Sequence, residues 1–556
     1  MYSMRGADLV IKLLERQGID IICGIPGGAM LPIYDALANS PIRHVLARHE
    51  QGAGFMAQGI ARSTGKTAVC FATSGPGATN VLTAIADARS DSVPLVCITG
   101  QVSSGLLGTD AFQEVDIYGM SIPVTKHNFL IRSGKELLSA IPEAFSIAAS
   151  GRPGPVLIDI PRDVQMGKVE FDAWPEPGKR TQPPAIPMDR LTRAVALLKE
   201  AKRPVLMAGG GVVVSGAALK VRALAERMGM PVSMSMLGLG TLPQDHPLYL
   251  GMLGMHGARF TNLVLDECDL LLVAGARLDD RATGKVNAFC PNAKVIHVDI
   301  DRSEHGKIRR TDINILGDVC EVFEYFMEHY TDDGNRRDAW VNRVGDLKKQ
   351  FPLHMPDCDN PLSAYGIVKK VAEIVPDDTI VATDVGQHQM RAAQAYPLRY
   401  PRTWLSSGGQ GTMGFGMPAA IGAALVHPDR LVVSFSGDGS LLMNIQEMAT
   451  AVDQNVNMKV ILQNNGGLGL IHQMQSLLFE GRNSNWKHVG KTDFVAVAKG
   501  FGMDAVDLST SEDPEKDLRE ALLRPGPGLI QVVLDVRDDV YPVVPPGASN
   551  TDMIGD

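Results

Sequence analysis

Short runs rich in Val, Ile and Leu recur along the chain and alternate with longer stretches that have the 3.6-residue spacing of amphipathic helices. The run at 431–435 stops at Gly437, Asp438 and Gly439, and a helical pattern separates it from the next run at 459–462. Uninterrupted apolar runs are characteristic of strands that are buried on both faces of a parallel sheet. The pattern therefore predicts an α/β fold built from doubly wound parallel sheets.

Two Pro-rich segments without periodicity interrupt this alternation, as linkers between domains commonly do. We therefore expect three doubly wound α/β domains, two linkers, and a Pro-rich tail that lies over the surface or closes a site. The domains are expected at 1–165, 189–345 and 362–540, the linkers at 166–188 and 346–361, and the tail at 541–556. The first and third domains look like distant structural repeats, because both combine α/β character with a glycine-rich edge.

Composition narrows the class of protein. Of the 556 residues, 45% are hydrophobic and 21% are charged, and the net charge of −9 comes without any basic run. These features argue against a nucleic-acid partner. The seven cysteines are scattered without a CxxC pair, which is typical of free thiols in a reducing compartment. We see no signal sequence and no apolar stretch long enough to cross a bilayer, and therefore expect a cytoplasmic protein without membrane contact.

The turn after the 431–435 run carries the first candidate site. Asp438 and Asn465 both stand where a predicted strand ends, one strand–helix–strand unit apart, so they are expected at one edge of a parallel sheet. Carboxylate and amide oxygens suit Mg²⁺, and the N–H groups of Gly439 and Ser440 open a helix that suits a phosphate. A lone GDG turn is more often structural, with a capping Asp, but GDG followed by NN resembles the thiamine diphosphate motif.

Thiamine diphosphate needs two further groups. One is a carboxylate beside its aminopyrimidine, for general acid–base catalysis through the cofactor, and the other is an apolar wedge that bends it. Glu50, between a predicted strand and a helix of small residues, is the candidate carboxylate, although acids in this position often serve only the helix N-terminus. Met413 is the candidate wedge: methionines usually fill gaps in a core, but its neighbouring glycines leave this thioether projecting.

The middle third of the chain carries a second set of turns. Gly209 to Gly211 follow one predicted strand, Gly275 and Arg277 follow another, and Asp299 follows a third. Glycines after one strand and an acid after another suit a nucleotide, but the spacing does not match GxGxxG. These residues alone support a nucleotide site and ordinary strand–helix turns about equally.

Longer motifs show a family resemblance. The chain contains IPGGAMLPIYDAL, RHEQGAGFMAQGIAR, TSGPGATN, GTDAFQEVD, LGMLGMHG, DDRATGK, DVGQHQM, GTMGFGMPAAIGAAL and FSGDGSLLMNIQEMATA. With these motifs it resembles, over essentially its full length, the catalytic subunit of acetohydroxyacid synthase (acetolactate synthase). The resemblance implies three domains of the thiamine-diphosphate enzyme type, with Mg²⁺ and FAD as further cofactors. Because the net reaction moves no electrons, the FAD would be structural.

The resemblance also implies roles for individual residues. It assigns Mg²⁺ to Asp438, Asn465 and the backbone carbonyl of Gly467. It places thiamine diphosphate beside Glu50, Gln387, His388, Met413, Gly439 and Ser440. It implies that Gly28, Phe112 and Gln113 face the reacting carbons and that Arg281 binds the carboxylate of the second substrate. It surrounds FAD with Arg152, Gly209, Gly210, Gly211, Met255, His256, Gly275, Arg277, Asp299 and Asp318.

The implied reaction decarboxylates pyruvate and condenses the remainder with a second 2-keto acid. Pyruvate as acceptor gives 2-acetolactate and 2-ketobutyrate gives 2-aceto-2-hydroxybutyrate, the first common step toward valine, leucine and isoleucine.

Three positions depart from the family pattern. Met474 stands where many members have a Trp that favours 2-ketobutyrate, which resembles the less selective isozyme I type, so we expect weak discrimination between acceptors. Arg162 replaces the Lys of IPKD and keeps the charge but not the Lys geometry. The added Gly466 loosens the turn after the paired Asn but should leave the carbonyl ligand in place.

Rival functions make different demands on the sequence. A pyruvate oxidase would use FAD for electrons, a glyoxylate carboligase would have an apolar residue in place of Glu50, and a simple 2-keto-acid decarboxylase would carry a tandem His pair, which this chain lacks. A catalytically silent paralogue acting as a regulatory scaffold is the rival from another class. The joint presence of Glu50, Asp438 and Asn465 argues against that scaffold.

The expected domains also bear on partners. Glu50 and the diphosphate loop lie on separate expected domains, so the cofactor must bridge them. The family does this across a dimer. We therefore expect a homodimer or tetramer, with the family's small regulatory subunit as a further partner.

Overall fold

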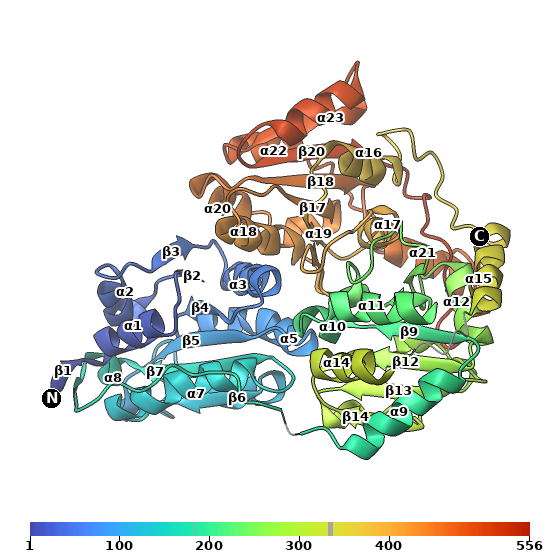
Figure 1. Ribbon diagram of the computed structural model, residues 1–556. Coiled ribbons are helices and arrows are strands. Elements are labelled where there is room, and N and C mark those ends of the chain that lie inside the picture. The colour runs from blue at the N-terminus through green and yellow to red at the C-terminus, as the bar shows by residue number, and fades with distance from the viewer. Residues whose placement is uncertain (184, 332–336, 556) are drawn as a thin grey trace.

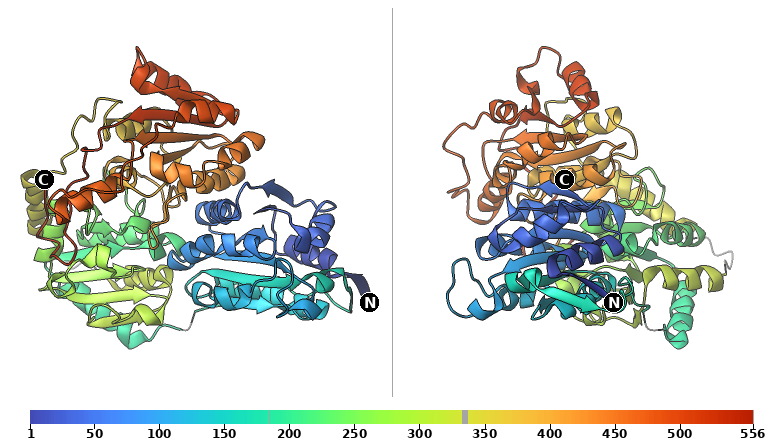
Figure 2. Two further views of the ribbon diagram at one scale, coloured as in Figure 1. Left: turned by 180° about the vertical axis from the view of Figure 1, so that it is seen from behind. Right: turned by 90° about the vertical axis from the view of Figure 1, so that its left-hand side faces the viewer.

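A computed structural model describes residues 1–183, 185–331 and 337–555, so residue 184 of the expected first linker, 332–336 of the expected central domain and 556 of the tail lie outside the described residues. The chain forms three α/β domains, each built around a six-stranded parallel sheet, which confirms the expected fold class. The N-terminal domain (blue to cyan) and the central domain (green to yellow) lie side by side, and the C-terminal domain (orange to red) lies across both (Figure 1). The reverse view shows the same triangular arrangement (Figure 2).

The N-terminal sheet has the strand order β3-β2-β4-β5-β7-β6. Its strands are β2 (Ile21–Gly24), β3 (Arg43–Leu46), β4 (Ala68–Ala72), β5 (Leu95–Gln101), β6 (His127–Leu130) and β7 (Pro155–Pro161). Its helices are α1 (Gly6–Arg16), α2 (Leu31–Leu37), α3 (Glu50–Thr64), α4 (Pro76–Asn80), α5 (Leu82–Ser90), α6 (Ile117–Ser121), α7 (Leu137–Ala149) and α8 (Arg162–Met166). The inner strands β4, β5 and β7 are buried along their whole length, because helices cover both faces, and this explains their uninterrupted apolar sequences.

The C-terminal sheet has the order β16-β15-β17-β18-β20-β19. Its strands are β15 (Ile380–Thr383), β16 (Trp404–Leu405), β17 (Val432–Gly437), β18 (Met458–Asn464), β19 (Asp504–Asp507) and β20 (Gly528–Val533). Its helices are α16 (Gly366–Ile374), α17 (Gln387–Ala395), α18 (Gly416–Val426), α19 (Asp438–Met443), α20 (Glu447–Asp453), α21 (Gly469–Leu478), α22 (Phe494–Gly500) and α23 (Pro514–Leu523). Numbered within each domain, the N- and C-terminal sheets share the order 2-1-3-4-6-5, as expected of structural repeats.

The central sheet is wound differently, in the order β11-β10-β9-β12-β13-β14. Its strands are β9 (Pro204–Ala208), β10 (Val232–Met234), β11 (Tyr249–Met252), β12 (Leu270–Ala274), β13 (Lys294–Asp299) and β14 (Ile313–Leu316). Its helices are α9 (Met188–Glu200), α10 (Gly210–Val214), α11 (Ala218–Met228), α12 (Arg259–Glu267), α13 (Asp280–Thr283), α14 (Val319–His329) and α15 (Asp338–Gln350). Within the domain this order is 3-2-1-4-5-6, that of dinucleotide-binding sheets.

Ligands of such sheets bind where the strand order reverses, at the carboxyl ends of the strands. These points lie between β2 and β4 in the N-terminal sheet, between β9 and β12 in the central sheet, and between β15 and β17 in the C-terminal sheet. The glycine-rich turns of the sequence follow these strands.

The structure differs from the sequence expectation at the linkers. Strand β8 (Lys168–Phe171) lies within the expected first linker and pairs antiparallel with β1 (Tyr2–Arg5), because Val169 and Phe171 are buried against the N-terminal core. Helix α15 runs past the expected end of the central domain at residue 345.

The tail lies along the central domain. The backbone N–H of Val544 donates to the carbonyl of Met255, and the side-chain amide of Asn550 donates to the carbonyl of Ala282.

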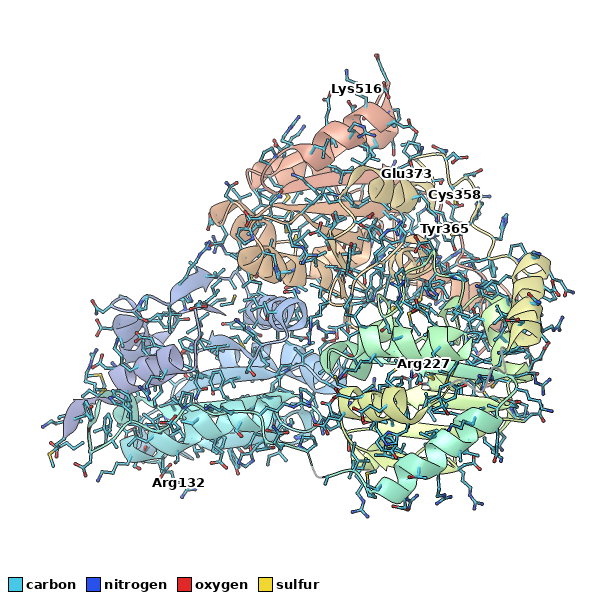
Figure 3. All side chains as sticks on the ribbon, viewed as in Figure 1. Arg132, Arg227, Cys358, Tyr365, Glu373 and Lys516 are labelled. Atoms are coloured by element: carbon cyan, nitrogen blue, oxygen red, sulfur yellow. The ribbon has the colours of Figure 1, made fainter. Side chains whose placement is uncertain are left out.

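Charged residues lie on the exterior of the three domains. The exposed charged side chains include Arg132 and Lys516, which point into the solvent (Figure 3). Among the described residues, no helix combines the length and the apolar character that crossing a bilayer requires.

Helices α3 and α18 join the N-terminal domain to the C-terminal domain through glycines. A Cβ at Gly59 would overlap the carbonyl oxygen of Ala419, and one at Gly422 would overlap the carbonyl oxygen of Met56. The two helix backbones therefore touch. The small residues that both helices show in sequence thus set the distance between the two domains.

We expect Gly422→Val to destabilise the protein by about 1–3 kcal/mol, because the added side chain must push the two helices apart. The midpoint of urea unfolding measures the effect. Gly345→Ala in α15 is the matched control. In the described part of the chain, no atom outside its own helix backbone and adjacent residues lies within 4 Å of its added Cβ, so it should leave the midpoint unchanged or raise it. An unchanged midpoint for Gly422→Val would contradict this account of the domain contact.

Candidate active site

A cavity of about 180 Å³ opens where the strand order of the C-terminal sheet reverses. All eight residues that the sequence assigned to this domain for the metal or the thiamine cofactor line it, although they come from four separate segments. They are Gln387, His388, Met413, Asp438, Gly439, Ser440, Asn465 and Gly467. The cavity therefore gathers the predicted diphosphate and metal groups in one place.

Close packing explains the glycines of the GDG turn. A Cβ at Gly437 would lie 2.8 Å from Nδ1 of His388. A Cβ at Gly439 would lie 2.6 Å from Leu468 and 3.6 Å from the methyl carbon of Met413. The methyl end of Met413 thus reaches the cavity wall beside Gly439, as a projecting wedge would, and does not fill the core of the sheet.

Asp438 is 2% exposed, and burial raises the pKa of its carboxyl, opposed by His488, whose Nε2 lies 3.8 Å away, and by backbone N–H groups. A cation bound here would offset the desolvation of the carboxylate. Among the described residues there is no group of three His, Cys, Asp or Glu side chains that could hold a metal. A metal beside Asp438 would instead draw on amide and carbonyl oxygens, which suits Mg²⁺.

The remaining polar groups of the cavity also suit an anionic ligand and its metal. His388 is 5% exposed, burial lowers the pKa of its imidazole to about 3, and its buried Nε2 has no hydrogen-bond partner in the described chain. Nδ2 of Asn465 donates to Gln387 at 3.1 Å, while its Oδ1 accepts a long bond of 3.3 Å from the N–H of Gly467. The neutral imidazole and the oriented amide oxygen are both available to a polar ligand.

Glu50 lies in the N-terminal domain as the first residue of α3 and is 8% exposed. Asn80 donates to its Oε2 at 2.9 Å, and a Cβ at Gly77 would lie 3.1 Å from its Oε1. The helix start is capped by His49, which accepts from the N–H of Gln51. Since His49 caps the helix, Glu50 is free for another role. Asn80 belongs to the TSGPGATN motif, but no separate signal marked it as the partner of Glu50.

Of the other N-terminal candidates, Gln113 packs against the turn that leads into Gly77. A Cβ at Gly75 would lie 2.8 Å from the carbonyl oxygen of Gln113. Phe112 is 87% exposed, and among the described residues other than its chain neighbours, none has an atom within 4 Å of a Cβ at Gly28. Neither Glu50 nor Gly28, Phe112 or Gln113 lines the cavity of Asp438. The structure therefore places two candidate half-sites on different domains of one chain.

A larger cavity, of about 460 Å³, lies where the three domains meet. Nine of the ten residues that the sequence assigned to FAD line it: Arg152, Gly210, Gly211, Met255, His256, Gly275, Arg277, Asp299 and Asp318. Gly209 does not, because it packs against the next turn, where a Cβ would overlap the carbonyl oxygen of Gly275. Arg281 and Met474 line the same cavity, which places the predicted acceptor groups beside the predicted flavin groups.

Charged groups of this cavity tie the domains together. Arg152 of the N-terminal domain donates to Glu304 at 2.9 Å and to Asp301 at 3.3 Å. Burial raises the pKa of Asp299 to about 7. Asp318 accepts from Arg180 at 2.6 Å. Arg180 lies in the expected first linker, and no motif marks it, because only the return of the linker to the cavity brings it there.

Of the three departures from the family pattern, two lie at the cavities. Met474 lines the larger one. Gly466 has a φ of 73°, which favours glycine, and leads into the cavity wall at Gly467. Arg162 begins α8 and is exposed, and it lines neither cavity.

Three family models match the chain. Residues 4–120 match the N-terminal TPP binding domain of thiamine pyrophosphate enzymes, residues 191–326 the central domain, and residues 384–532 the C-terminal TPP binding domain. Thiamine pyrophosphate is another name for thiamine diphosphate. The models at either end of the chain correspond to the two half-sites, and the central model covers most of the dinucleotide-type sheet.

Curated relatives match over the whole length. The chain is 55% identical to the acetolactate synthase isozyme 1 large subunit of Escherichia coli (strain K12), over 99% of this chain and 98% of that protein. It is 44% identical to the acetolactate synthase large subunit of Parasynechococcus marenigrum, over 100% of this chain and 91% of that protein, and 42% identical to the isozyme 2 large subunit of E. coli, over 99% of both. The chain therefore belongs to the acetolactate synthase large-subunit family of thiamine pyrophosphate enzymes.

Proposed function

We propose that the chain decarboxylates pyruvate and condenses the product with a second 2-keto acid, pyruvate or 2-ketobutyrate, to form 2-acetolactate or 2-aceto-2-hydroxybutyrate. Its family membership supports the activity, and one structural observation supports the location of the active site. The cavity of Asp438 brings together eight candidate residues from separate segments, with an unpartnered, buried imidazole nitrogen of His388 among them.

Asp438, Asn465 and the carbonyl of Gly467 would hold Mg²⁺, which would neutralise part of the charge of the diphosphate. The raised pKa of Asp438 supports a cation there, since a positive charge favours the ionised carboxylate. Gly439, Ser440, Gln387 and His388 would contact the diphosphate. These residues supply oxygen ligands and N–H donors of the kinds that Mg²⁺ and phosphates prefer.

FAD would occupy the larger cavity. The 3-2-1-4-5-6 strand order of the central sheet and the glycine turns after β9 and β12 support a dinucleotide. Because residues of all three domains line this cavity, a bound flavin would also hold the domains together. We assign it a structural role.

Bound thiamine diphosphate supplies a carbon nucleophile and an electron sink for the loss of carbon dioxide. Glu50 would hold and release a proton at the aminopyrimidine through Oε1, since Asn80 already occupies Oε2. Met413 would contact the cofactor from the Gly439 side. Arg281, whose guanidinium is largely exposed in the larger cavity, would bind the carboxylate of the second substrate with two parallel hydrogen bonds. Gly28, Phe112 and Gln113 would face the reacting carbons.

Two copies of the chain would complete each site. The half-site of Glu50 and the cavity of Asp438 lie on separate domains, so we propose that a second copy supplies the missing half. Sedimentation together with activity at increasing dilution tests this proposal. Full activity of a monomer would contradict it. Because its relatives are large subunits, we further propose a small regulatory subunit as partner and the cytoplasm as location.

The direct test is to supply the purified protein with pyruvate, thiamine diphosphate and Mg²⁺ and to measure acetolactate while recording the flavin spectrum. We expect acetolactate and carbon dioxide, with the flavin absorbance unchanged. Bleaching of the flavin by pyruvate would instead indicate an oxidase. Failure to form acetolactate would overturn the proposed function.

We expect weak discrimination between the two acceptors, because Met474 is narrow and flexible compared with the Trp of other members. Met474→Trp should then raise the preference for 2-ketobutyrate about tenfold, the usual effect of one well-contacted methylene. Competition between both acceptors, with quantification of both products, measures it. Leu478→Trp, one turn further along α21 and outside the cavity, is the control. A wild-type protein that strongly prefers 2-ketobutyrate would contradict the expectation.

A further inference from the structure

The loop at 406–412 leads from β16 to Met413 and lies where the three domains meet. Gly411 lines both cavities, so the loop forms part of their shared wall. A Cβ at Gly408 would lie 2.9 Å from Leu237, and one at Gly409 would lie 2.9 Å from both Arg277 and Asp91. The loop is thus enclosed by the central domain on one side and the N-terminal domain on the other.

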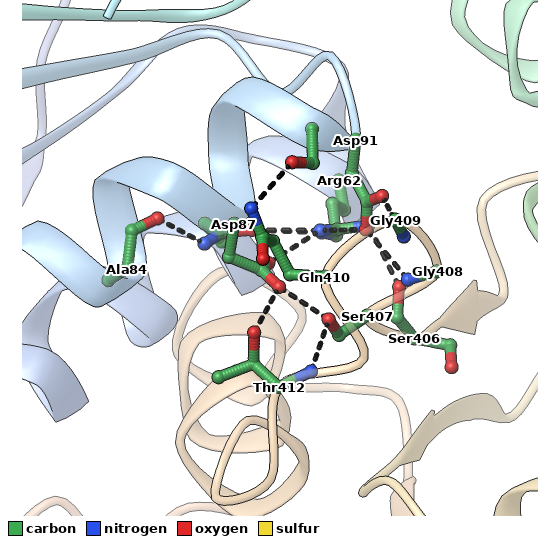
Figure 4. A network of polar contacts seen from close by, with 12 residues as sticks. Arg62, Ala84, Asp87, Asp91, Ser406, Ser407, Gly408, Gly409, Gln410 and Thr412 are labelled. Atoms are coloured by element: carbon green, nitrogen blue, oxygen red, sulfur yellow. Dashed lines mark hydrogen bonds and ion pairs between the residues drawn. The ribbon is translucent and has the colours of Figure 1, made fainter. Parts of the chain in front are cut away.

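Three charged side chains of the N-terminal domain hold the loop, and we call Arg62, Asp87 and Asp91 the interdomain clamp (Figure 4). Asp91 accepts from the N–H of Gly409 at 2.7 Å and from the N–H of Gly408 at 2.9 Å. Arg62 donates to the carbonyl of Ser406 at 3.0 Å and to both carboxylates of the clamp.

Asp87 holds the end of the loop that leads to Met413 and the cavity of Asp438. It is fully buried, and its Oδ1 accepts from the hydroxyl of Ser407 and, at 2.8 Å, from the hydroxyl of Thr412. The hydroxyl of Ser407 in turn accepts from the N–H of Thr412 at 2.9 Å. Thr412 directly precedes Met413, and on the other side the N–H of Gly414 donates to Asp384 at 2.7 Å. The backbone of Met413 is therefore fixed from both sides.

The charged composition of the clamp indicates that it fixes the position of the loop and adds little to the stability of the fold. Two carboxylates and one guanidinium buried between domains must be desolvated, and apolar packing often stabilises as well as such a group or better. The contact of α3 with α18 shows that these same two domains also meet through small apolar residues. Hydrogen bonds to a carboxylate are directional and stronger than neutral ones, so they fix a loop position that apolar packing would leave adjustable.

We propose that Asp87 is a positioning residue for catalysis: through Ser407 and Thr412 it fixes Met413 at the diphosphate cavity. This inference rests on the proposed function, because it assigns Asp87 to the site at which thiamine diphosphate binds. Asp87 touches neither cavity and acts through the loop.

Asp87→Asn and Thr412→Val test the proposal while keeping the side-chain shape. The neutral amide of Asn accepts a weaker hydrogen bond from Thr412 and no longer pairs with Arg62, and Val lacks the hydroxyl altogether. We expect each to lower kcat about 10- to 100-fold and to raise the dissociation constant of thiamine diphosphate, measured by equilibrium dialysis with Mg²⁺, several-fold, as small misplacements at a site do. The KM for pyruvate should change by less than about twofold. The double variant should be no worse than Thr412→Val alone by more than the loss of the pair with Arg62, since both substitutions act on the same hydrogen bond.

Two further variants separate positioning from a general loss of stability. Thr412→Ser keeps the hydroxyl and should restore the wild-type dissociation constant. Asp269→Asn weakens an acceptor of the N–H groups of Lys202 and Arg203 within the central domain, away from the loop, and should change neither kcat nor cofactor affinity.

Retention of kcat and of cofactor affinity within about twofold by Asp87→Asn would overturn the proposal, as would equal losses in Thr412→Ser and Thr412→Val. If Asp87→Asn fails to fold, the two Thr412 variants decide alone. If the wild-type protein binds thiamine diphosphate but forms no acetolactate, the proposed function fails, while dialysis still tests the role of Asp87.

Discussion

Replacement of Glu50 by Gln is expected to lower kcat for acetolactate formation by about 100- to 10,000-fold, the usual contribution of a general acid or base. Gln has the shape of Glu and still accepts the hydrogen bond of Asn80, but it cannot exchange a proton with the cofactor. The fold should be unaffected, because His49 and not Glu50 caps α3. Initial rates at saturating pyruvate, thiamine diphosphate and Mg²⁺ measure the effect.

Glu136→Gln is the matched control for this experiment. Glu136 also stands at the start of a helix, α7, in the same domain, where it accepts from the N–H of Arg132 at 2.8 Å. A helix-terminal acid contributes about 0.3–1 kcal/mol to stability and nothing to the chemistry, so this variant should keep its rate. If Glu50→Gln kept the wild-type rate, Glu50 would serve only as a helix-terminal acid. The proposed mechanism would then lack its proton-transferring group.

The second large effect is expected for Asp438→Asn, which should abolish the Mg²⁺-dependent binding of thiamine diphosphate. Wild-type protein with cofactor and Mg²⁺ at about 100 times the dissociation constant should gain about 2.7 kcal/mol of stability, and the variant should gain none. Thermal unfolding with and without the cofactor pair measures this difference.

Without ligands, the same variant should be more stable than the wild type. Burial raises the pKa of Asp438 in the folded protein, so its ionisation at neutral pH opposes folding, and Asn removes this cost. The stability difference should vanish as the pH falls below the unfolded-state pKa of Asp, because both states are then protonated. A lower stability of the ligand-free variant would contradict the buried-carboxylate account.

Asp535→Asn controls for the loss of a carboxylate near a strand end. Asp535 follows β20 in the same sheet, but it is exposed and paired with Arg537. Its replacement should leave the stabilisation by cofactor and Mg²⁺ unchanged. If both Asp variants lose that stabilisation equally, the metal site does not lie at Asp438.

The predicted strands and the turns that follow them were determined by the sequence alone. A parallel strand buried on both faces needs an uninterrupted apolar run, and its carboxyl end lies at the ligand edge, so polar residues directly after such a run converge. This local rule was sufficient to place Asp438, Gly439, Ser440 and Asn465. The flanking glycines marked Met413, and the family motifs added Gln387, His388 and Gly467. The same rule left the central domain undecided, because plain turns and nucleotide turns share their glycines.

Only the tertiary structure decided what depends on contacts between segments far apart in the chain. The strand order of the central sheet, the packing role of Gly209, and the return of Arg180 to the larger cavity have no local signature. The interdomain clamp is the clearest case: Asp87 lies in an ordinary helix, and its role follows from the loop of another domain that packs against it. Such contacts are set by how whole domains dock, which no short stretch of sequence encodes.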